Sequence, residues 1–187
     1  NPYKFDPAKA KALLAEAGYP DGFEIQLDTG NTQPFTGVAQ SIQSTFAEAG
    51  VKVKINAAEV KQVLTTYRAR QHQMIFMYWG PDYLDPNANA DSFANNPDNS
   101  DNSSSKPLAW RNSWDIPEIM AETRAALKEG DSEKRKEMYL DLQGKLQKSG
   151  PFLHMFQESE QTVLRKNVKG FFSGPNADLV FYYDVSK

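Results

Sequence analysis

Apolar positions along the first 80 residues repeat with two different periods. Spacings of three to four predict three amphipathic helices, and alternating or unbroken apolar runs predict three strands. The predicted helices span residues 7–17, 34–49 and 58–71, and the predicted strands span residues 23–27, 51–55 and 74–79. Asp6 and Pro7 suit the N-cap and the first position of the first helix. Helices and strands therefore alternate one for one in this part of the chain.

The connections between the predicted strands are long enough to hold a helix each. Strands joined by helical crossovers of this length usually lie parallel in one sheet. The run from Met74 to Trp79 is apolar without a break, which is typical of a strand covered on both faces. The pattern predicts an α/β fold with a mainly parallel sheet flanked by helices.

The rest of the chain contains further helices and a polar stretch. Asp115 and Ser132 are placed to begin two further helices. Residues 87–105 are almost all Asn, Asp, Ser and Ala, which predicts a long loop with few apolar contacts. Further strands are predicted at residues 152–156, 162–164 and 179–183. No repeat or clear linker divides the sequence, so we expect residues 1–187 to form a single lobe.

The amino-acid composition excludes several classes of function. The chain carries 21 basic and 24 acidic side chains and a formal net charge of −3, whereas a nucleic-acid interface needs a basic patch. There is no cysteine, so disulfides, thiolate zinc sites and cysteine nucleophiles are excluded. The longest apolar run is far too short to span a membrane. We therefore expect no nucleic-acid partner.

Few residues suit catalysis or a cofactor. His72 and His154 are the only histidines, and neither lies in a nucleophile motif. There is no glycine-rich phosphate loop and no His-rich metal site, so we expect no cofactor. Asp82, Asp85 and Asp91 suit a hard cation or acid–base chemistry, and a small α/β hydrolase with Asp82 and Asp85 as acid and base is an alternative interpretation. Aspartates in loops are also ordinary turn formers and helix caps.

The sequence from Tyr78 to Pro86 places two aromatic residues and a carboxylate directly after an apolar strand. In an open parallel sheet, ligands bind just past the carboxyl ends of the strands. Tyr78 and Trp79 suit an apolar wall, and Asp82 suits an orienting charge for an amine. The alternative is that the two aromatic side chains complete the core.

Three segments resemble the family 5 extracytoplasmic solute-binding proteins, which are the dipeptide-, oligopeptide- and nickel-binding proteins of ABC importers. Asp6 to Pro20, with the sequence DPAKAKALLAEAGYP, is similar to the start of the family's C-terminal lobe. Residues 39–53 are similar to its next helix and strand, and Trp79-Gly80-Pro81-Asp82 matches its Trp-x-x-Asp pattern. The likeness is continuous over about the first 100 residues and looser beyond them.

The resemblance implies a lobe of the type II periplasmic-binding-protein fold, in a protein whose two lobes close around a solute. It implies that Asp82 pairs with the amine of a peptide or other small amine-bearing solute, and that Trp79, with Tyr78 and Tyr83 beside it, lines the pocket. The implied partners are the solute, the missing N-terminal lobe of the same protein, and the ABC permease of the inner membrane. The expected location is periplasmic or extracytoplasmic, with membrane association through the transporter, and no enzyme activity is expected.

One loop departs from the dipeptide-binding members of the family. Those members carry an arginine for the ligand's carboxylate in the loop after the first strand, whereas residues 29–35 here contain no basic side chain. The resemblance therefore does not specify a dipeptide ligand. A third interpretation is an interaction module that binds a protein through the polar stretch at residues 95–105.

Overall fold

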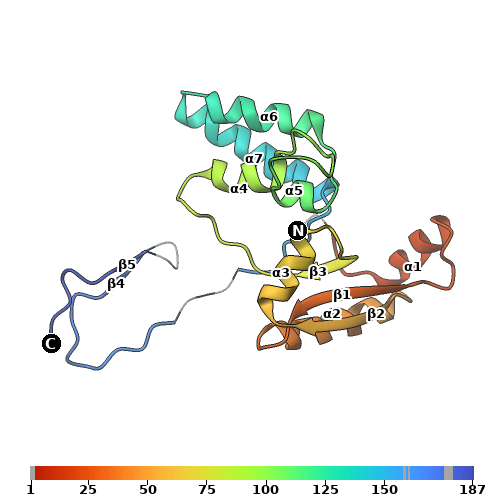
Figure 1. Ribbon diagram of the computed structural model, residues 1–187, viewed down its shortest axis with the longest axis horizontal. Coiled ribbons are helices and arrows are strands. Elements are labelled where there is room, and N and C mark those ends of the chain that lie inside the picture. Colours follow the sequence, from red (N-terminus) through yellow and green to blue (C-terminus); the bar gives the residue numbers. More distant parts are fainter. Residues whose placement is uncertain (1–2, 158, 160, 175–178) are drawn as a thin grey trace.

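In the described part of the chain, a three-stranded parallel sheet forms the first layer of the molecule (Figure 1). The computed structural model describes residues 3–157, 159, 161–174 and 179–187. The strands are β1 (Glu24–Gly30), β2 (Lys52–Ala58) and β3 (Met74–Phe76), in the order β2-β1-β3. Leu27 of β1 is paired with Ile55 on one side and with Met74 on the other. The predicted parallel sheet is confirmed, with the first strand at its centre.

Apolar residues at alternate strand positions build the core of this layer. Leu27, Val51 and Val53 form one buried cluster with Ala39 of α2 (Phe35–Glu48). Helix α2 contacts β1 and β2, and α3 (Val60–Arg68) contacts β1. Full burial of a leucine or valine side chain contributes about 1.5–3 kcal/mol. This burial is why the alternating pattern located the first two strands correctly.

Helix α1 (Pro7–Glu16) begins as predicted but lies on the surface. Asp6 is its N-cap and accepts a hydrogen bond from the Lys9 amide at 2.9 Å. Leu14 packs against the sheet core, whereas its neighbour Leu13 is 53% exposed. The apolar face predicted for this helix is therefore buried only in part.

Two glycines allow the turn before β1 to touch the turn before β2. Gly22 has a φ of 74° and Gly50 a φ of 92°, both in the left-handed region. A Cβ atom at Gly22 would lie 1.9 Å from the carbonyl oxygen of Gly50. Glycine alone tolerates both the conformation and this approach. The two turns can therefore start β1 and β2 side by side.

Four helices of the described chain form the second layer (Figure 1). They are α4 (Pro86–Ala94), α5 (Leu108–Arg111), α6 (Pro117–Lys128) and α7 (Ser132–Ser149). Helix α6 packs against α7, and α4 contacts both. Their shared core contains Ala90, Ala126, Tyr139 and Leu142. The two alanines let the backbones of these helices approach closely, while the two larger side chains fill the space between them.

The polar stretch predicted as one long loop is partly helical. Helix α4 forms because Asp85 caps it and Pro86 occupies its first turn. Three of its alanines are buried, so a sequence of small residues still finds apolar contacts here. The prediction of a loop over residues 87–105 is therefore wrong up to residue 94, and the irregular segment spans residues 95–107.

The helix starts predicted at Asp115 and Ser132 each lie one residue away from the observed caps. Ile116 is the N-cap of α6 and makes no side-chain capping hydrogen bond, while a proline follows it at the first helical position. Asp131 is the N-cap of α7 and accepts a hydrogen bond from the Lys134 amide at 2.8 Å. At α7 an aspartate therefore caps the helix where a serine was predicted.

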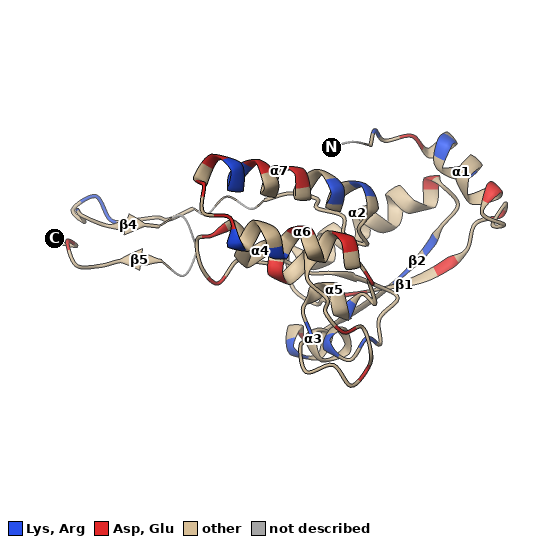
Figure 2. Ribbon diagram, turned by 90° about the horizontal axis from the view of Figure 1, so that it is seen from above, with Lys and Arg blue, Asp and Glu red and all other residues tan. Residues whose placement is uncertain are grey.

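Charged residues of both signs are mixed on the outside of the helical layer. Figure 2 shows Lys and Arg beside Asp and Glu along α7. Lys145 of this helix pairs with Glu122 of α6 at 2.7 Å and with Asp141 at 2.8 Å. This mixture differs from the one-signed basic stripe that binds nucleic acid. None of the described helices is long and apolar enough to cross a membrane.

The C-terminal part of the chain leaves both layers. Two short strands, β4 (Phe172–Ser173) and β5 (Val180–Phe181), pair antiparallel and lie away from the first sheet and the helices in Figure 1. The strand predicted at residues 179–183 is thus confirmed in part. Residues 152–156 and 162–164 were also predicted as strands, but they form none, so those two predictions are wrong.

Candidate functional site

The segment from residue 77 to residue 85 runs from the carboxyl end of β3 to the start of α4, and we call it the linking segment. The strand predicted over residues 74–79 ends at Phe76, so Tyr78 and Trp79 lie in the linking segment and not in the sheet. Irregular chain at the carboxyl edge of a parallel sheet is the usual position of ligand contacts. The structure therefore places the predicted site residues at the carboxyl edge of the parallel sheet, where a ligand could reach them.

Tyr78 stands out from the surface instead of completing the core. The residue is 76% exposed. Its ring stacks on Phe35 of α2, with centroids 6.0 Å apart and ring planes 29° apart. Phe35 is buried and also meets Phe76 edge-on at 5.9 Å. Tyr78 is therefore an exposed aromatic surface supported from below by the core.

Trp79 is anchored to the helical layer while part of its ring stays open to solvent. Its Nε1 donates a hydrogen bond to Asn89 Oδ1 of α4 at 3.0 Å. The indole also meets Phe93 of α4 edge-on, with centroids 5.9 Å apart. The residue remains 40% exposed. Both contacts fix the plane of the indole against α4.

Asp82 and Tyr83 lie at the exposed middle of the linking segment. Tyr83 is 52% exposed, and Asp82 is exposed as well. Within the described residues, the Asp82 carboxylate makes no hydrogen bond and no ion pair. This carboxylate is therefore available to a cationic group from outside the chain.

Asp85 holds the other end of the linking segment. Its Oδ1 accepts a hydrogen bond from the Asn87 amide at 2.8 Å, which caps α4. Arg135 of α7 donates to both carboxylate oxygens, at 2.7 Å and 3.1 Å. The hydrogen bonds from Arg135, and then the one from the Asn87 amide, lower the pKa of the Asp85 carboxyl below its ordinary value. A carboxyl held ionised in this way is a poor general acid, which argues against the hydrolase interpretation.

Arg135 belongs to a polar network inside the helical layer. Its Nη2 also donates to the Tyr139 hydroxyl at 3.3 Å, and its guanidinium carbon lies 4.9 Å from the centre of the Tyr139 ring. The Tyr139 hydroxyl donates to Asn87 Oδ1 at 3.2 Å, and both of these residues are buried. Burial raises the pKa of the Tyr139 hydroxyl, which keeps it a donor. The network joins α7 to the first turn of α4.

Aromatic contacts connect the linking segment to the chain after α7. Trp79 meets Phe93, and Phe93 in turn meets Phe152 edge-on with centroids 4.9 Å apart. His154 lies 5.4 Å from Phe93, so this histidine takes part in an aromatic cluster. Such pairs contribute about 0.5–1.5 kcal/mol each beyond their burial. Phe152 and His154 therefore pack on Phe93 of α4 and pair in no strand, while Leu153 and Phe156 of the same run stay exposed.

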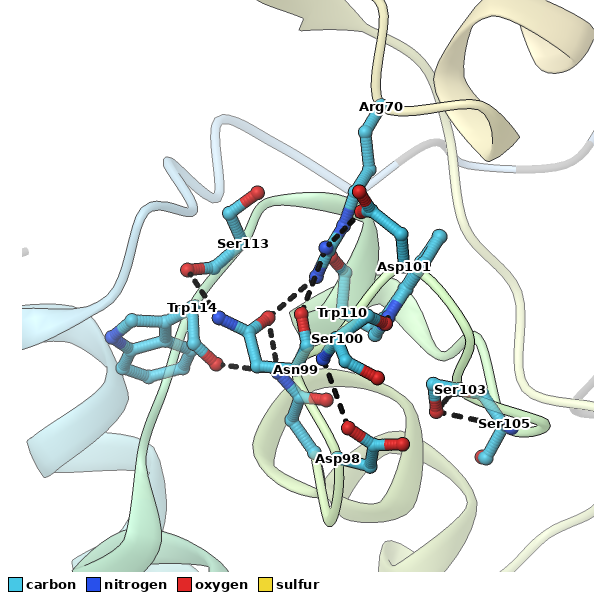
Figure 3. A network of polar contacts seen from close by, with 11 residues as sticks. Arg70, Asp98, Asn99, Ser100, Asp101, Ser103, Ser105, Trp110, Ser113 and Trp114 are labelled. Carbon is cyan, nitrogen blue, oxygen red and sulfur yellow. Dashed lines mark hydrogen bonds and ion pairs between the residues drawn. The ribbon is translucent and has the colours of Figure 1, made fainter.

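A polar cluster that the sequence patterns did not predict surrounds Arg70 (Figure 3). The Arg70 guanidinium donates to the backbone carbonyls of Asn99 and Trp110 and to the Asn99 side chain. It also pairs with Asp101 at 3.3 Å. These bonds tie the chain just after α3 to residues 95–107. No sequence signal could have found the cluster, because Arg70 lies 29 to 40 positions before its partners and shares no motif with them.

The polar side chains of the irregular segment are largely used within the fold. Asn96 and Ser103 are buried. The Asn96 amide donates to the Trp114 carbonyl at 2.9 Å and to Asn99 Oδ1 at 3.0 Å. The interpretation of residues 95–105 as a protein-binding module therefore gains no support from the structure.

Asp28 is a buried carboxylate that the sequence patterns did not predict. It lies in the central strand and is 2% exposed. Its Oδ1 accepts hydrogen bonds from Gln26 Nε2 at 2.9 Å and from Asn56 Nδ2 at 2.6 Å. Its Oδ2 is buried without a hydrogen-bond partner among the described residues. The same residues contain no group of three or more His, Cys, Asp or Glu side chains arranged for a metal ion.

Comparison with known proteins places this arrangement in a family. Residues 1–101 match the model of the bacterial extracellular solute-binding proteins, family 5 Middle. The chain belongs to this family. The matched part includes all three strands of the parallel sheet, the linking segment and α4. Family membership therefore rests on the region that carries the candidate site.

Two curated relatives match nearly the whole chain. The glutathione-binding protein GsiB of Salmonella typhimurium is 28% identical over 189 residues, which cover 96% of this chain and 35% of the relative. The dipeptide-binding protein of Escherichia coli is 31% identical over 179 residues, which cover 92% of this chain and 32% of the relative. The chain thus spans about a third of the length of the curated relatives it matches.

A solved structure shows the same fold. The ABC transporter-associated periplasmic binding protein DppA of Helicobacter pylori, solved in complex with the peptide STSA, matches with a TM-score of 0.71 at 29% identity. The match covers 81% of this chain and 28% of that chain. The resemblance to family 5 and the periplasmic-binding-protein-like α/β fold are therefore confirmed, and the family is one of solute-binding proteins, not hydrolases. The roles of Tyr78, Trp79, Asp82 and Tyr83 stay predictions.

Proposed function

We propose that the chain forms one wall of the solute cleft in the substrate-binding component of an ABC importer. The solute we propose is a peptide or a related small molecule that carries an amine. Membership of a solute-binding family supports binding without catalysis. The names of the relatives, which bind glutathione or dipeptides, support a peptide-like solute. The observation that carries the proposal is the linking segment, where exposed aromatic rings accompany a carboxylate that has no cationic partner among the described residues.

Asp82 is the residue proposed to orient the solute. Tyr78, Trp79 and Tyr83 offer apolar surface on the same segment, and a cleft lined by aromatic rings with one charge suits a small amphipathic ligand. Closure of a cleft over the pair excludes water, so the attraction between carboxylate and ammonium becomes stronger than on an open surface. Removal of one member of a buried pair costs about 3–5 kcal/mol, because the other charge is left unpaired.

The opposite wall is proposed to come from another lobe of a longer protein. Described residues between 151 and 187 include no buried side chain, although many are large and apolar. Those most exposed to solvent are Leu153, Met155, Phe156, Val163, Leu164, Phe172, Leu179, Phe181, Tyr182, Tyr183 and Val185. Apolar surface on this scale is normally covered. We propose that the other lobe covers it, and that the whole protein acts outside the cytoplasm and delivers its solute to the permease.

The test is calorimetric titration of the two-lobed protein with a peptide library, followed by one charge-removing variant. Asp82→Asn should weaken binding of the best peptide by about two to three orders of magnitude, in line with the loss of a buried pair. Acetylation of the peptide's amine should cause a similar loss in the unchanged protein and little further loss in the variant, because both changes delete one interaction.

Asp21→Asn is the matched control. Asp21 is also an exposed aspartate in a turn, but it precedes β1 and therefore lies at the amino edge of the sheet, opposite the linking segment. This variant should bind peptides like the unchanged protein. A solute without an amine, or unchanged affinity in Asp82→Asn, contradicts the proposed role of Asp82.

A further inference from the structure

The linking segment is held on α4 at two points. The Trp79 indole donates a hydrogen bond to α4 at 3.0 Å. Asp85, at the end of the segment, caps α4 and receives two hydrogen bonds from Arg135 of α7. Residues 80–84 lie between these anchors, and Asp82 is the middle one of the five. Two fixed points therefore determine where the exposed carboxylate stands.

We infer that Arg135 is a positioning residue for the solute: through Asp85 it fixes the segment that presents the Asp82 carboxylate to an amine. This inference rests on the proposed function of the linking segment. The pair is partly shielded from water, since the Arg135 side chain is 25% exposed and that of Asp85 35%. Two parallel hydrogen bonds between a guanidinium and a carboxylate also allow only one relative orientation.

Fixing this segment in advance matters because it has no regular secondary structure. Residues 80–84 belong to no helix or strand. A binding segment that is mobile before binding must lose conformational freedom when the solute binds, which lowers affinity. A segment that already occupies the competent conformation avoids that loss. Arg135 therefore contributes to affinity without touching the solute.

Two variants remove the link from opposite ends. Arg135→Gln removes the cation. Asp85→Asn removes the charge that Arg135 binds but keeps a residue that caps helices as well as aspartate does. Lys145→Gln is the control: it removes another cation of α7, whose ion pairs run to Glu122 of α6 and to Asp141.

The first measurement needs no solute. Backbone ¹⁵N order parameters of residues 80 and 82–84 should fall in Arg135→Gln from values near the rigid limit of about 0.85 to below about 0.6. Asp85→Asn should lower them equally, and the double variant no further, because both changes remove one interaction. Lys145→Gln should leave them unchanged. If Arg135 serves only to stabilise the packing of α7 on α4, Arg135→Gln will leave the order parameters of residues 80 and 82–84 as unchanged as Lys145→Gln does.

The second measurement is the affinity of the two-lobed protein for its best peptide. Arg135→Gln should weaken binding by about tenfold, which corresponds to about 1.4 kcal/mol. The same variant should have a much smaller effect on binding of the N-acetylated peptide, whose affinity no longer depends on Asp82. Lys145→Gln should bind both peptides normally.

The outcomes separate this inference from the proposed function. If Asp82→Asn weakens binding but Arg135→Gln changes neither affinity nor the order parameters, the positioning role is overturned while the proposed function stands. If Asp82→Asn leaves affinity unchanged, the proposed function fails, and the claim that Arg135 positions a solute fails with it. Loss of order and loss of affinity in Arg135→Gln, with Lys145→Gln normal in both, supports the positioning role.

Discussion

The guanidinium carbon of Arg70 lies 3.8 Å from the centre of the Trp110 ring, and the same guanidinium donates a hydrogen bond to the Trp110 carbonyl (Figure 3). Arg70 also has a φ of 57°, in the left-handed region, directly after the end of α3. One side chain therefore connects the layer that contains the sheet to the irregular segment 95–107 and to α5 through a stacked ring and several hydrogen bonds.

We expect Arg70→Gln to lower the free energy of unfolding by about 2–4 kcal/mol. The side chain is only 13% exposed, and the variant leaves the Asn99 and Trp110 carbonyls without their charged donor. Urea denaturation followed by circular dichroism measures the change. Asp101→Asn is the control, since Asp101 is 94% exposed and should change stability by no more than about 0.5 kcal/mol. Equal stability of both variants contradicts the assignment of the cluster as an anchor.

The contact between Gly22 and Gly50 predicts unequal tolerance of alanine. Gly22→Ala should cost at least about 2 kcal/mol, because it combines a positive φ with a Cβ that meets the Gly50 carbonyl. Gly50→Ala should cost only about 1–2 kcal/mol, because its φ is also positive but the nearest atom to its Cβ is 3.8 Å away. Thermal unfolding of the two variants ranks them. The reverse order would mean that the turn before β1 can move away.

Truncation of two leucines of α7 to alanine should have unequal effects on the free energy of unfolding. Leu142 is 2% exposed in the helical core, so Leu142→Ala should cost about 2–5 kcal/mol. Leu140 is 57% exposed, and Leu140→Ala should change stability by no more than about 0.5 kcal/mol. Chemical denaturation of both variants is the measurement. A comparable loss in both would show that another surface covers Leu140.

The pairing of Asp85 with Arg135 predicts a contribution to stability that depends on pH. The folded-state pKa of Asp85 is lowered, so the folded chain holds this carboxyl ionised at pH values where the unfolded chain protonates it. The contribution is complete above the ordinary carboxyl pKa of about 3.9 and is lost as the pH falls through the lower, folded value. Denaturation between pH 6 and pH 2 should therefore show a smaller acid-induced loss in Asp85→Asn than in the unchanged chain. Parallel curves for the two proteins would contradict this.

The sheet and its first two helices were predictable because their order comes from local patterns. Val51 and Val53 alternate with polar residues and are buried, as a half-buried strand requires. Helix α4 was missed because its sequence of alanine and polar residues resembles a loop, and its start depends on a cap at Asp85 that is also a common turn residue. Tertiary packing of the small side chains makes this segment a helix and not a loop.

The candidate site was predictable in position but not in architecture. The motif from Trp79 to Asp82 located the segment, and the parallel sheet located its edge. The support from Arg135 and from Phe93 could not be inferred, because an arginine on a polar helix face and a phenylalanine in a polar stretch carry no sign of what they contact. Contacts between residues distant in sequence exist only once the two layers have been assembled.

The central place of β1 also bears on how the molecule is built over time. Paired residues of β1 and β2 are 28 positions apart, as in Glu24 with Lys52, whereas Thr29 and Phe76 are 47 apart. Closing a longer loop costs more entropy, and β3 offers only three residues in return. We therefore expect the β1–β2 pair to form early and β3 to join late. The linking segment directly follows β3, so a partly folded molecule in which β3 has not yet joined the sheet would lack the proposed binding surface. Such a molecule could not compete with fully folded molecules for the solute.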